Sequence, residues 1–190
     1  MVLHRYFFAL QPDDPASDQI DGVTRRLLRQ RPWLEPPMAR ARRHVSLNAL
    51  GRDAAPLDDW VSRAVRAVAR IRWPAFEVAF NRIAAFAGRS GKQALVLRGD
   101  EGVVGIDLLQ SAIQAALADA ALAPRHSRPF EAHLTLARGR DSSDEAFIRP
   151  VCWTVREFVL IHSYVGQARY EIAARFPLAA PGGGGGAPTA

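Results

Sequence analysis

The sequence predicts an α+β protein built from two similar lobes. Apolar runs rich in β-branched and aromatic residues occur in clusters, and amphipathic helical patterns lie between them. One short pattern also occurs twice, as HVSL at His44–Leu47 and as HLTL at His133–Leu136. Each copy follows a predicted helix and a loop that contains proline and arginine, which indicates two halves of like construction facing one another.

The first half of the chain predicts two strands and two helices. Its strands are apolar runs closed by turn residues, and its helices repeat apolar residues at spacings of three and four. In chain order these are a strand at Leu3–Leu10, a helix at Ser17–Gln30, a proline-rich loop at Arg31–Pro37, a strand at Arg43–Leu50 and a helix at Pro56–Arg72. Asp58 and Asp59 favour the start of the second helix, because acidic side chains stabilise a helix N-terminus.

The second half predicts a hairpin, a long helix and further strands. In chain order these are strands at Phe76–Phe86 and Gln93–Leu97, a helix at Val103–Leu122, a basic loop at Pro124–Pro129, and strands at Ala132–Ala137, Val151–Val165 and Ala168–Phe176. Gly88–Gly91 separates the first two strands as a hairpin turn would. The glycine run Gly182–Gly186 predicts a flexible tail at 181–190, which leaves 1–180 as a single bilobal domain.

Composition is typical of a globular protein that favours anionic partners. The chain has 190 residues, of which 48% are hydrophobic and 23% charged, so wholesale disorder is excluded. The net charge is +6, and it comes almost wholly from arginine, because Lys92 is the only lysine. Such a field permits phosphate or nucleic-acid partners, although a GC-rich coding bias explains the same composition.

Cysteine use and hydropathy predict the compartment. The single cysteine, Cys152, excludes an internal disulfide and a cysteine-based zinc cluster, and it favours a reducing compartment. Its apolar neighbours predict a buried thiol. The sequence has no run of roughly 18 apolar residues, and its first residues do not form an export signal. We therefore expect a cytoplasmic protein that does not associate with membranes.

The repeated pattern puts a histidine and a hydroxyl on one face of each predicted strand. Side chains alternate along a strand, so His44 and Ser46 share a face, as do His133 and Thr135, while their apolar neighbours point to the core. Imidazole donates or accepts a proton near neutral pH, and hydroxyl groups can hold phosphate oxygens. Two such strands around a cleft predict phosphoryl-transfer chemistry that requires no metal.

Other kinds of site fit the sequence less well. A zinc site would need further ligands, but the sequence has no HExxH, HxH or CxxC pattern, and only Glu131 adjoins either histidine pattern. The glycines at 99, 102 and 105 have neither the lysine of a P-loop nor the spacing of a dinucleotide-binding motif. The three further histidines are weaker candidates, since His4 begins a predicted strand, His126 lies in the basic loop and His162 lies within an apolar strand.

Four segments carry a resemblance to a known family: Arg5–Leu10, His44–Gly51, Phe130–Arg138 and Arg175–Leu178. They resemble the two-histidine (2H) phosphoesterase superfamily, and within it the RNA 2′,3′-cyclic phosphodiesterases also called 2′-5′ RNA ligases. The resemblance implies a bilobal fold with a pseudo-twofold axis, with antiparallel sheets around a central cleft and helices outside. It also implies cofactor-free, metal-independent hydrolysis of 2′,3′-cyclic phosphates to 2′-phosphates, and in some members joining or cleavage of 2′-5′ linkages.

The resemblance assigns roles to five residues: His44 and His133 as acid and base, Ser46 and Thr135 as phosphate-binding residues, and Arg138 as a substrate contact. We assign His133 to activate water and His44 to protonate the departing 3′ oxygen, and the reverse stays open. Arg138 lies five residues after His133, so it reaches the same face only if the strand ends or bulges before Gly139. Otherwise Arg138 is a solvated arginine at a strand end.

The sequence departs from the family where a base would bind. Ala49 stands where ligase-type members carry a phenylalanine that can stack on a base. Tyr6, Phe8 or Tyr164 would then supply the ring, unless each belongs to the core. The segment 166–170 resembles a family turn but is one residue longer. Arginines at 40–43 and 125–128 form either a positive rim or a solvated surface.

Three functions follow from the sequence. The first is hydrolysis of 2′,3′-cyclic phosphate on RNA ends or small nucleotides by a monomer. The second is a phosphodiesterase for another cyclic or 2′-5′-linked nucleotide, which Ala49 favours. The third is a non-catalytic RNA-binding or nucleotide-binding module. The intact histidines and hydroxyls argue against the third, because binding alone needs neither an acid nor a base.

Overall fold

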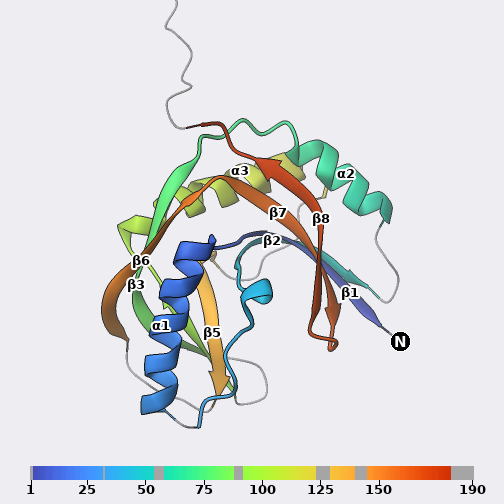
Figure 1. The fold of residues 1–190 in the computed structure, drawn as a ribbon. Coiled ribbons are helices and arrows are strands. Elements are labelled where there is room, and N and C mark those ends of the chain that lie inside the picture. The colour runs from blue at the N-terminus through green and yellow to red at the C-terminus, as the bar shows by residue number, and fades with distance from the viewer. Residues whose placement is uncertain are drawn as a thin grey trace, which may run out of the picture.

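The computed structural model describes residues 2–31, 33–53, 58–87, 92–122, 129–139 and 145–180. Eight strands form one strongly curved antiparallel sheet in the order β6-β3-β4-β5-β2-β1-β7-β8, and three helices pack against it (Figure 1). The α+β prediction is therefore confirmed. The expected tail at 181–190, the hairpin turn at 88–91 and most of the basic loop at 124–129 lie outside the described residues.

The observed bounds agree with the predicted elements in most places. The strands are β1 Leu3–Leu10, β2 Val45–Asp53, β3 Phe76–Ala87, β4 Gln93–Arg98, β5 His133–Gly139, β6 Ala146–Val155, β7 Glu157–Val165 and β8 Arg169–Pro177. The helices are α1 Asp14–Gln30, α2 Asp58–Val68 and α3 Val104–Asp119. Short 3₁₀ turns precede β2 at Arg40–Arg42 and α3 at Glu101–Val103.

The predicted strand at Val151–Val165 was wrong, because the chain changes lobes within it. Arg156 separates β6, which pairs with β3, from β7, which pairs with β1. The prediction of a buried Cys152 was also wrong. Cys152 is exposed, since it lies on an edge strand and alternates with the buried side chains of Val151 and Trp153.

The sheet divides into two lobes of four strands, β6-β3-β4-β5 and β2-β1-β7-β8. Within the described strands, the pair Val45 and Leu134 is the one register match between β2 and β5. Both side chains are fully buried in the core that the sheet shares with the helices. The opposite face of these two strands therefore carries the repeated histidine pattern from both lobes.

The helices cover the core face of the sheet. α1 contacts β5 and β6, α3 contacts β2 and β3, and α2 packs on α3 and β2. α1 begins where the Asp13 carboxylate accepts a hydrogen bond from the backbone N–H of Ala16 at 2.9 Å. α3 lies so close to β3 that a β-carbon on Gly105 would sit 2.4 Å from the Phe76 ring. In the described part of the chain, no helix is both long enough and apolar enough to span a membrane.

Candidate active site

The two histidine patterns lie on adjacent strands at the junction of the lobes. Antiparallel pairing of Val45 with Leu134, continued by one residue in each direction, sets His44 opposite Thr135 and Ser46 opposite His133. Residues directly opposite one another have β-carbons about 4.5–5.5 Å apart. The two imidazoles and two hydroxyls that the sequence predicted as a site therefore share one face, and all four side chains are partly accessible.

The two histidine rings are held in the same way. Nδ1 of His44 donates to the backbone carbonyl of Arg42 at 2.7 Å, and Nδ1 of His133 donates to that of Glu131 at 2.8 Å. A carbonyl oxygen can only accept, so Nδ1 carries the proton in both rings. In a neutral ring Nε2 then holds the lone pair. Nε2 is thus the atom of each histidine that can exchange a proton with a bound molecule.

His44 lies against an aromatic wall in its own lobe. The Phe7 and Tyr170 rings lie 5.0 and 5.5 Å from its ring centre, and the guanidinium of Arg42 lies 5.0 Å from the centre of the Tyr170 ring. Burial lowers the pKa of His44 to about 4, against an opposing effect of the Arg42 carbonyl, and the charge of Arg5 lowers it further. His44 is therefore neutral at pH 7 and suited to accept a proton.

His133 has an aromatic neighbour and an ion pair behind it. The Phe86 ring lies 4.9 Å from its ring centre, and the Arg98 guanidinium lies 5.6 Å from the centre of the Phe86 ring. Arg98 also forms an ion pair with Glu131, whose carbonyl holds the His133 ring. Arg98 thus contacts both groups that lie against His133, the Phe86 ring and Glu131. The hydrogen bond from His133 to the Glu131 carbonyl lies at the surface, so solvent reaches His133.

A bulge in β5 brings Arg138 back to the face of His133. Thr135 pairs with Val96 and Ala137 pairs with Leu95, so β5 contains one more residue than β4 at this point. Leu136 and Ala137 are both buried, and the next side chain, Arg138, is exposed. The bulge that the use of Arg138 required is therefore present before Gly139.

β2 repeats this irregularity in the other lobe. Its pairing with β1 shifts between Ser46 and Ala49, and Leu47 and Asn48 are both buried. Ala49 consequently returns to the face of His44, as Arg138 returns to the face of His133. The two lobes thus present alanine on one side and arginine on the other, each five residues after its histidine.

The rings proposed to replace the missing aromatic do not face the site. Phe8 is fully buried, Tyr6 stacks on His162 at 4.3 Å on the core side of β1, and Tyr164 hydrogen-bonds Glu171 at 2.7 Å in the same cluster. The aromatic rings beside the histidines are Phe7, Tyr170 and Phe86. Sequence reasoning missed them because strand order, which no motif encodes, brings them there.

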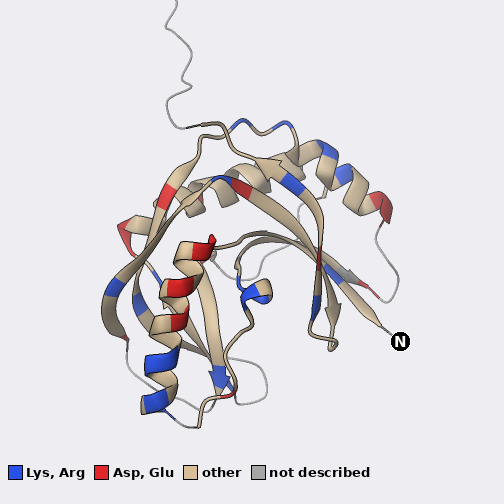
Figure 2. Ribbon diagram, in the orientation of Figure 1, with Lys and Arg blue, Asp and Glu red and all other residues tan. Residues whose placement is uncertain are grey.

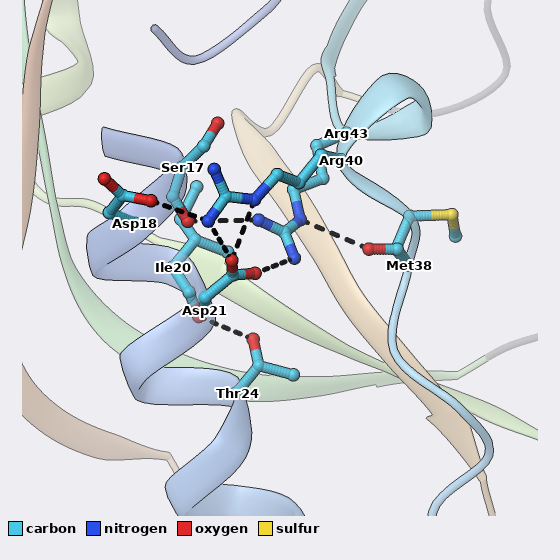
Figure 3. A network of polar contacts seen from close by, with 8 residues as sticks. All are labelled: Ser17, Asp18, Ile20, Asp21, Thr24, Met38, Arg40 and Arg43. Atoms are coloured by element: carbon cyan, nitrogen blue, oxygen red, sulfur yellow. Dashed lines mark hydrogen bonds and ion pairs between the residues drawn. The ribbon is translucent and has the colours of Figure 1, made fainter. Parts of the chain in front are cut away.

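The arginines before His44, for which the sequence left a positive rim and a solvated surface open, include two that anchor this segment to α1. Arg40 and Arg43 both bind Asp21 on α1, and Arg43 is 4% exposed and also donates to the carbonyls of Ser17 and Met38 (Figure 3). The residue next to His44 is thereby tied to α1. Arg43 is buried in this anchor, whereas Arg40 is 49% exposed and is paired with Asp18 and Asp21. Arg42 lies over the Tyr170 ring beside His44, and 125–128 lie outside the described residues.

The comparisons with known proteins decide the family. The model of the 2′-5′ RNA ligase superfamily matches residues 12–167 of this chain. The chain belongs to the 2′-5′ RNA ligase superfamily. Members of this superfamily are phosphoesterases, so the predicted relationship to the 2H phosphoesterases is confirmed. No curated protein matches the sequence.

Solved structures support the same fold for this superfamily member. Apo E. coli LigT is 23% identical with a TM-score of 0.73, and the alignment covers 94% of this chain and 99% of LigT. TT0787 of Thermus thermophilus is 19% identical with a TM-score of 0.69 and coverage of 93% and 99%. Usb1 of Kluyveromyces marxianus is 14% identical with a TM-score of 0.57 and coverage of 93% and 98%. LigT was also solved with 3′-AMP, with ATP and with NADP+.

Proposed function

We propose that the protein hydrolyses 2′,3′-cyclic phosphates at RNA ends or on small nucleotides to 2′-phosphates, without a metal ion. The matching Nδ1 hydrogen bonds of His44 and His133 carry this proposal, because they leave two Nε2 atoms for proton transfer on the face that also holds Ser46 and Thr135. One neutral and one protonated imidazole complete an acid–base pair. The hydroxyls and Arg138 would bind the phosphate oxygens.

The proposed roles of the histidines reverse the first assignment. His44, kept neutral by its low pKa, accepts a proton from water at Nε2 while the water oxygen attacks phosphorus. The bond between phosphorus and the 3′ oxygen breaks, and His133 gives its Nε2 proton to that oxygen. The products are a 2′-phosphate and a 3′-hydroxyl. Proton exchange with solvent then returns both rings to their starting states.

The product of a defined RNA tests the reaction. We expect a short RNA ending in a 2′,3′-cyclic phosphate to be converted to the 2′-phosphate at an unchanged rate in the presence of EDTA. Separation of the 2′- and 3′-phosphate products by chromatography measures this. A 3′-phosphate product would show that the wrong bond is broken, and loss of turnover in EDTA that added metal restores would contradict a metal-independent mechanism.

The pH dependence tests the role of His44. If His44 is the base, kcat/KM should rise with pH around pH 4, where the free protein loses the His44 proton, and fall again at higher pH when the acid is deprotonated. Rates measured between about pH 3 and 9, with circular dichroism to confirm folding, give both limbs. A rising limb at the ordinary imidazole value of about 6.5 would contradict this assignment.

Ala49 supports a second candidate, a phosphodiesterase for another cyclic or 2′-5′-linked nucleotide. A phenylalanine at this position would place a ring on the face of His44, and the alanine leaves that area to Tyr170 and Phe7. This change leaves the proton-transfer chemistry of the histidines unaffected. It does alter how the site can recognise a nucleobase. A panel of nucleoside 2′,3′-cyclic phosphates, 3′,5′-cyclic nucleotides and 2′-5′ dinucleotides separates the two. Ligation of 2′-5′ ends is the reverse of 2′-5′ linkage cleavage: a 5′-hydroxyl takes the place of water, attacks the phosphorus of the cyclic phosphate, and the bond to the 3′ oxygen breaks. It is tested by adding an RNA with a 5′-hydroxyl to the RNA that ends in a 2′,3′-cyclic phosphate.

A further inference from the structure

A groove of about 1120 Å³ lies between α1 and the edge strand β6, on the lobe of His133. One wall is the second half of α1 and the other is the first half of β6. The charged residues of its lining are Arg26, Arg31 and Arg149, and none of the described residues that line it is acidic. Arg26 and Arg149 form no hydrogen bond or ion pair with any described residue.

The charge of α1 favours an anionic occupant of this groove. The helix is acidic over its first half and basic over its second half, as Figure 2 shows by the red and blue segments of α1. Its acidic residues Asp18 and Asp21 are already paired with Arg40 and Arg43. The basic half that borders the groove is left without carboxylate partners in the described residues, so positive charge is unbalanced there.

One row of side chains runs from the candidate active site to the edge strand β6, on the face of the sheet opposite to α1. The register pairs are His133 with Arg98, Arg98 with Arg82, and Arg82 with Phe147, so the row crosses β5, β4, β3 and β6 on one face. Three strand spacings of about 4.8 Å make this path roughly 14 Å long. Arg82 and Arg98 are paired with carboxylates along it, so the net positive charge lies in the groove and not in the row.

Phe147 lies on the edge strand, where the row ends and the groove on the other face of the sheet begins. It is one of the residues that line the groove and is 73% exposed, which is unusual for a large apolar residue, and the Arg82 guanidinium lies 4.5 Å from the centre of its ring. Exposed aromatic rings flanked by arginines bind unpaired bases by stacking while the arginines contact the backbone. The surface therefore combines both parts of a single-strand binding site.

We propose that the α1–β6 groove binds the single-stranded RNA that precedes the reacting end. The occupant is RNA with unpaired bases, with one base on Phe147 and phosphates on Arg26 and Arg149. The inference rests on the proposed function, since it extends the substrate from the cyclic phosphate at His133 along the row and around the edge strand β6 to the groove. It predicts that substrate length matters.

Binding of two RNAs tests the groove separately from catalysis. Fluorescence anisotropy is measured with a labelled dinucleotide and with a labelled RNA of about 12 nucleotides, both ending in a 3′-phosphate that cannot turn over. We expect the longer RNA to bind more tightly. Phe147→Ala should weaken its binding about 5- to 150-fold, and the double variant Arg26→Ala/Arg149→Ala should reduce the slope of log affinity against log salt by about 1.4, while dinucleotide binding is unchanged.

A matched control is Arg66→Ala/Arg70→Ala, which removes two arginines from the surface between α2 and α3. It should leave the affinity for the longer RNA and its salt dependence unchanged. Groove variants that bind the longer RNA like the wild type, and that still hydrolyse a dinucleotide 2′,3′-cyclic phosphate, overturn the groove inference alone. If neither 3′-phosphate RNA binds and neither corresponding 2′,3′-cyclic phosphate is hydrolysed, the proposed function and the groove are overturned together. If the groove binds a polyglutamate peptide more tightly than RNA, it is a protein-binding surface. The groove inference is then wrong.

Discussion

Replacing His44 or His133 with alanine is expected to lower kcat about 10²- to 10⁴-fold, the range for removal of a general acid or base. In the proposed mechanism each ring exchanges its proton at Nε2, and no other described histidine lies on this face of the sheet to take its place. The kcat of the double variant should be little lower than that of the less active single variant. The effects of removing an acid and a base that act in the same step are not additive. Single-turnover rates with an RNA 2′,3′-cyclic phosphate measure this.

His4→Ala provides the control for these variants. His4 lies on the core side of β1, where its Nδ1 is 2.8 Å from Nε2 of His162, so this substitution also removes a partly buried imidazole. It should leave kcat within about twofold of the wild type, since the ring is outside the acid–base pair. A loss for His4→Ala as large as that for His44→Ala would show that general damage to the sheet explains both.

Replacing Arg43 is expected to cause the largest loss of stability. Its guanidinium is 4% exposed and binds Asp21 together with the carbonyls of Ser17 and Met38, so alanine leaves these groups without their partner. Breaking a buried ion pair costs about 3–5 kcal/mol. Because Asp21 keeps its ion pair with Arg40, we expect the free energy of unfolding to fall by about 3 kcal/mol, the lower end of this range. The shift of the urea unfolding midpoint measures this loss.

Arg40→Ala is the matched control for Arg43. The Arg40 side chain is 49% exposed, so its ion pairs with Asp18 and Asp21 are screened and its loss should cost no more than about 1 kcal/mol. Arg43→Lys, which keeps the charge but not the planar fork, should fall between the two. Equal losses for Arg40→Ala and Arg43→Ala would contradict the anchor described here.

Acid should weaken the same anchor. Burial raises the pKa of Asp21, but the hydrogen bonds from Arg43 and Arg40 outweigh this and hold the pKa below its usual value. The stabilisation is therefore complete above the ordinary carboxyl range and is lost as pH falls through the lowered value of the folded state. His44 acts in the same direction, because its folded pKa of about 4 favours protonation of the unfolded chain below about pH 6.5.

The fold was predictable where local patterns decide it. β1, α1 and α3 follow from apolar periodicity, and the structure has them within a few residues of their predicted bounds. The errors have a common cause in the order of strands. A continuous apolar run predicted one strand at Val151–Val165, but which lobe each part joins depends on partners far away in the chain. The exposure of Cys152 likewise depends on β6 being an edge strand.

The candidate site was predictable only in part. The repeated pattern named His44 and His133 because it is local, and alternation correctly placed each hydroxyl beside its histidine. The Tyr170 and Phe86 rings beside them come from β8 and β3, and no spacing in the sequence indicates this approach. The arginines before His44 could not be divided by sequence into structural and solvent-exposed members, because their carboxylate partners lie on α1.

In the described strands, β2 and β5 are paired at a single position, so the two histidines of the candidate site lie on two lobes that are joined weakly by the sheet. Each lobe supplies one imidazole and one hydroxyl, and the hydrogen-bonded ladder that would keep the lobes parallel is reduced to Val45 and Leu134. The separation of the two Nε2 atoms is therefore a property of the angle between lobes and not of either strand alone. Under the proposed mechanism, a substitution at this contact would change the relative timing of proton removal and proton delivery without altering any group proposed to touch the phosphate.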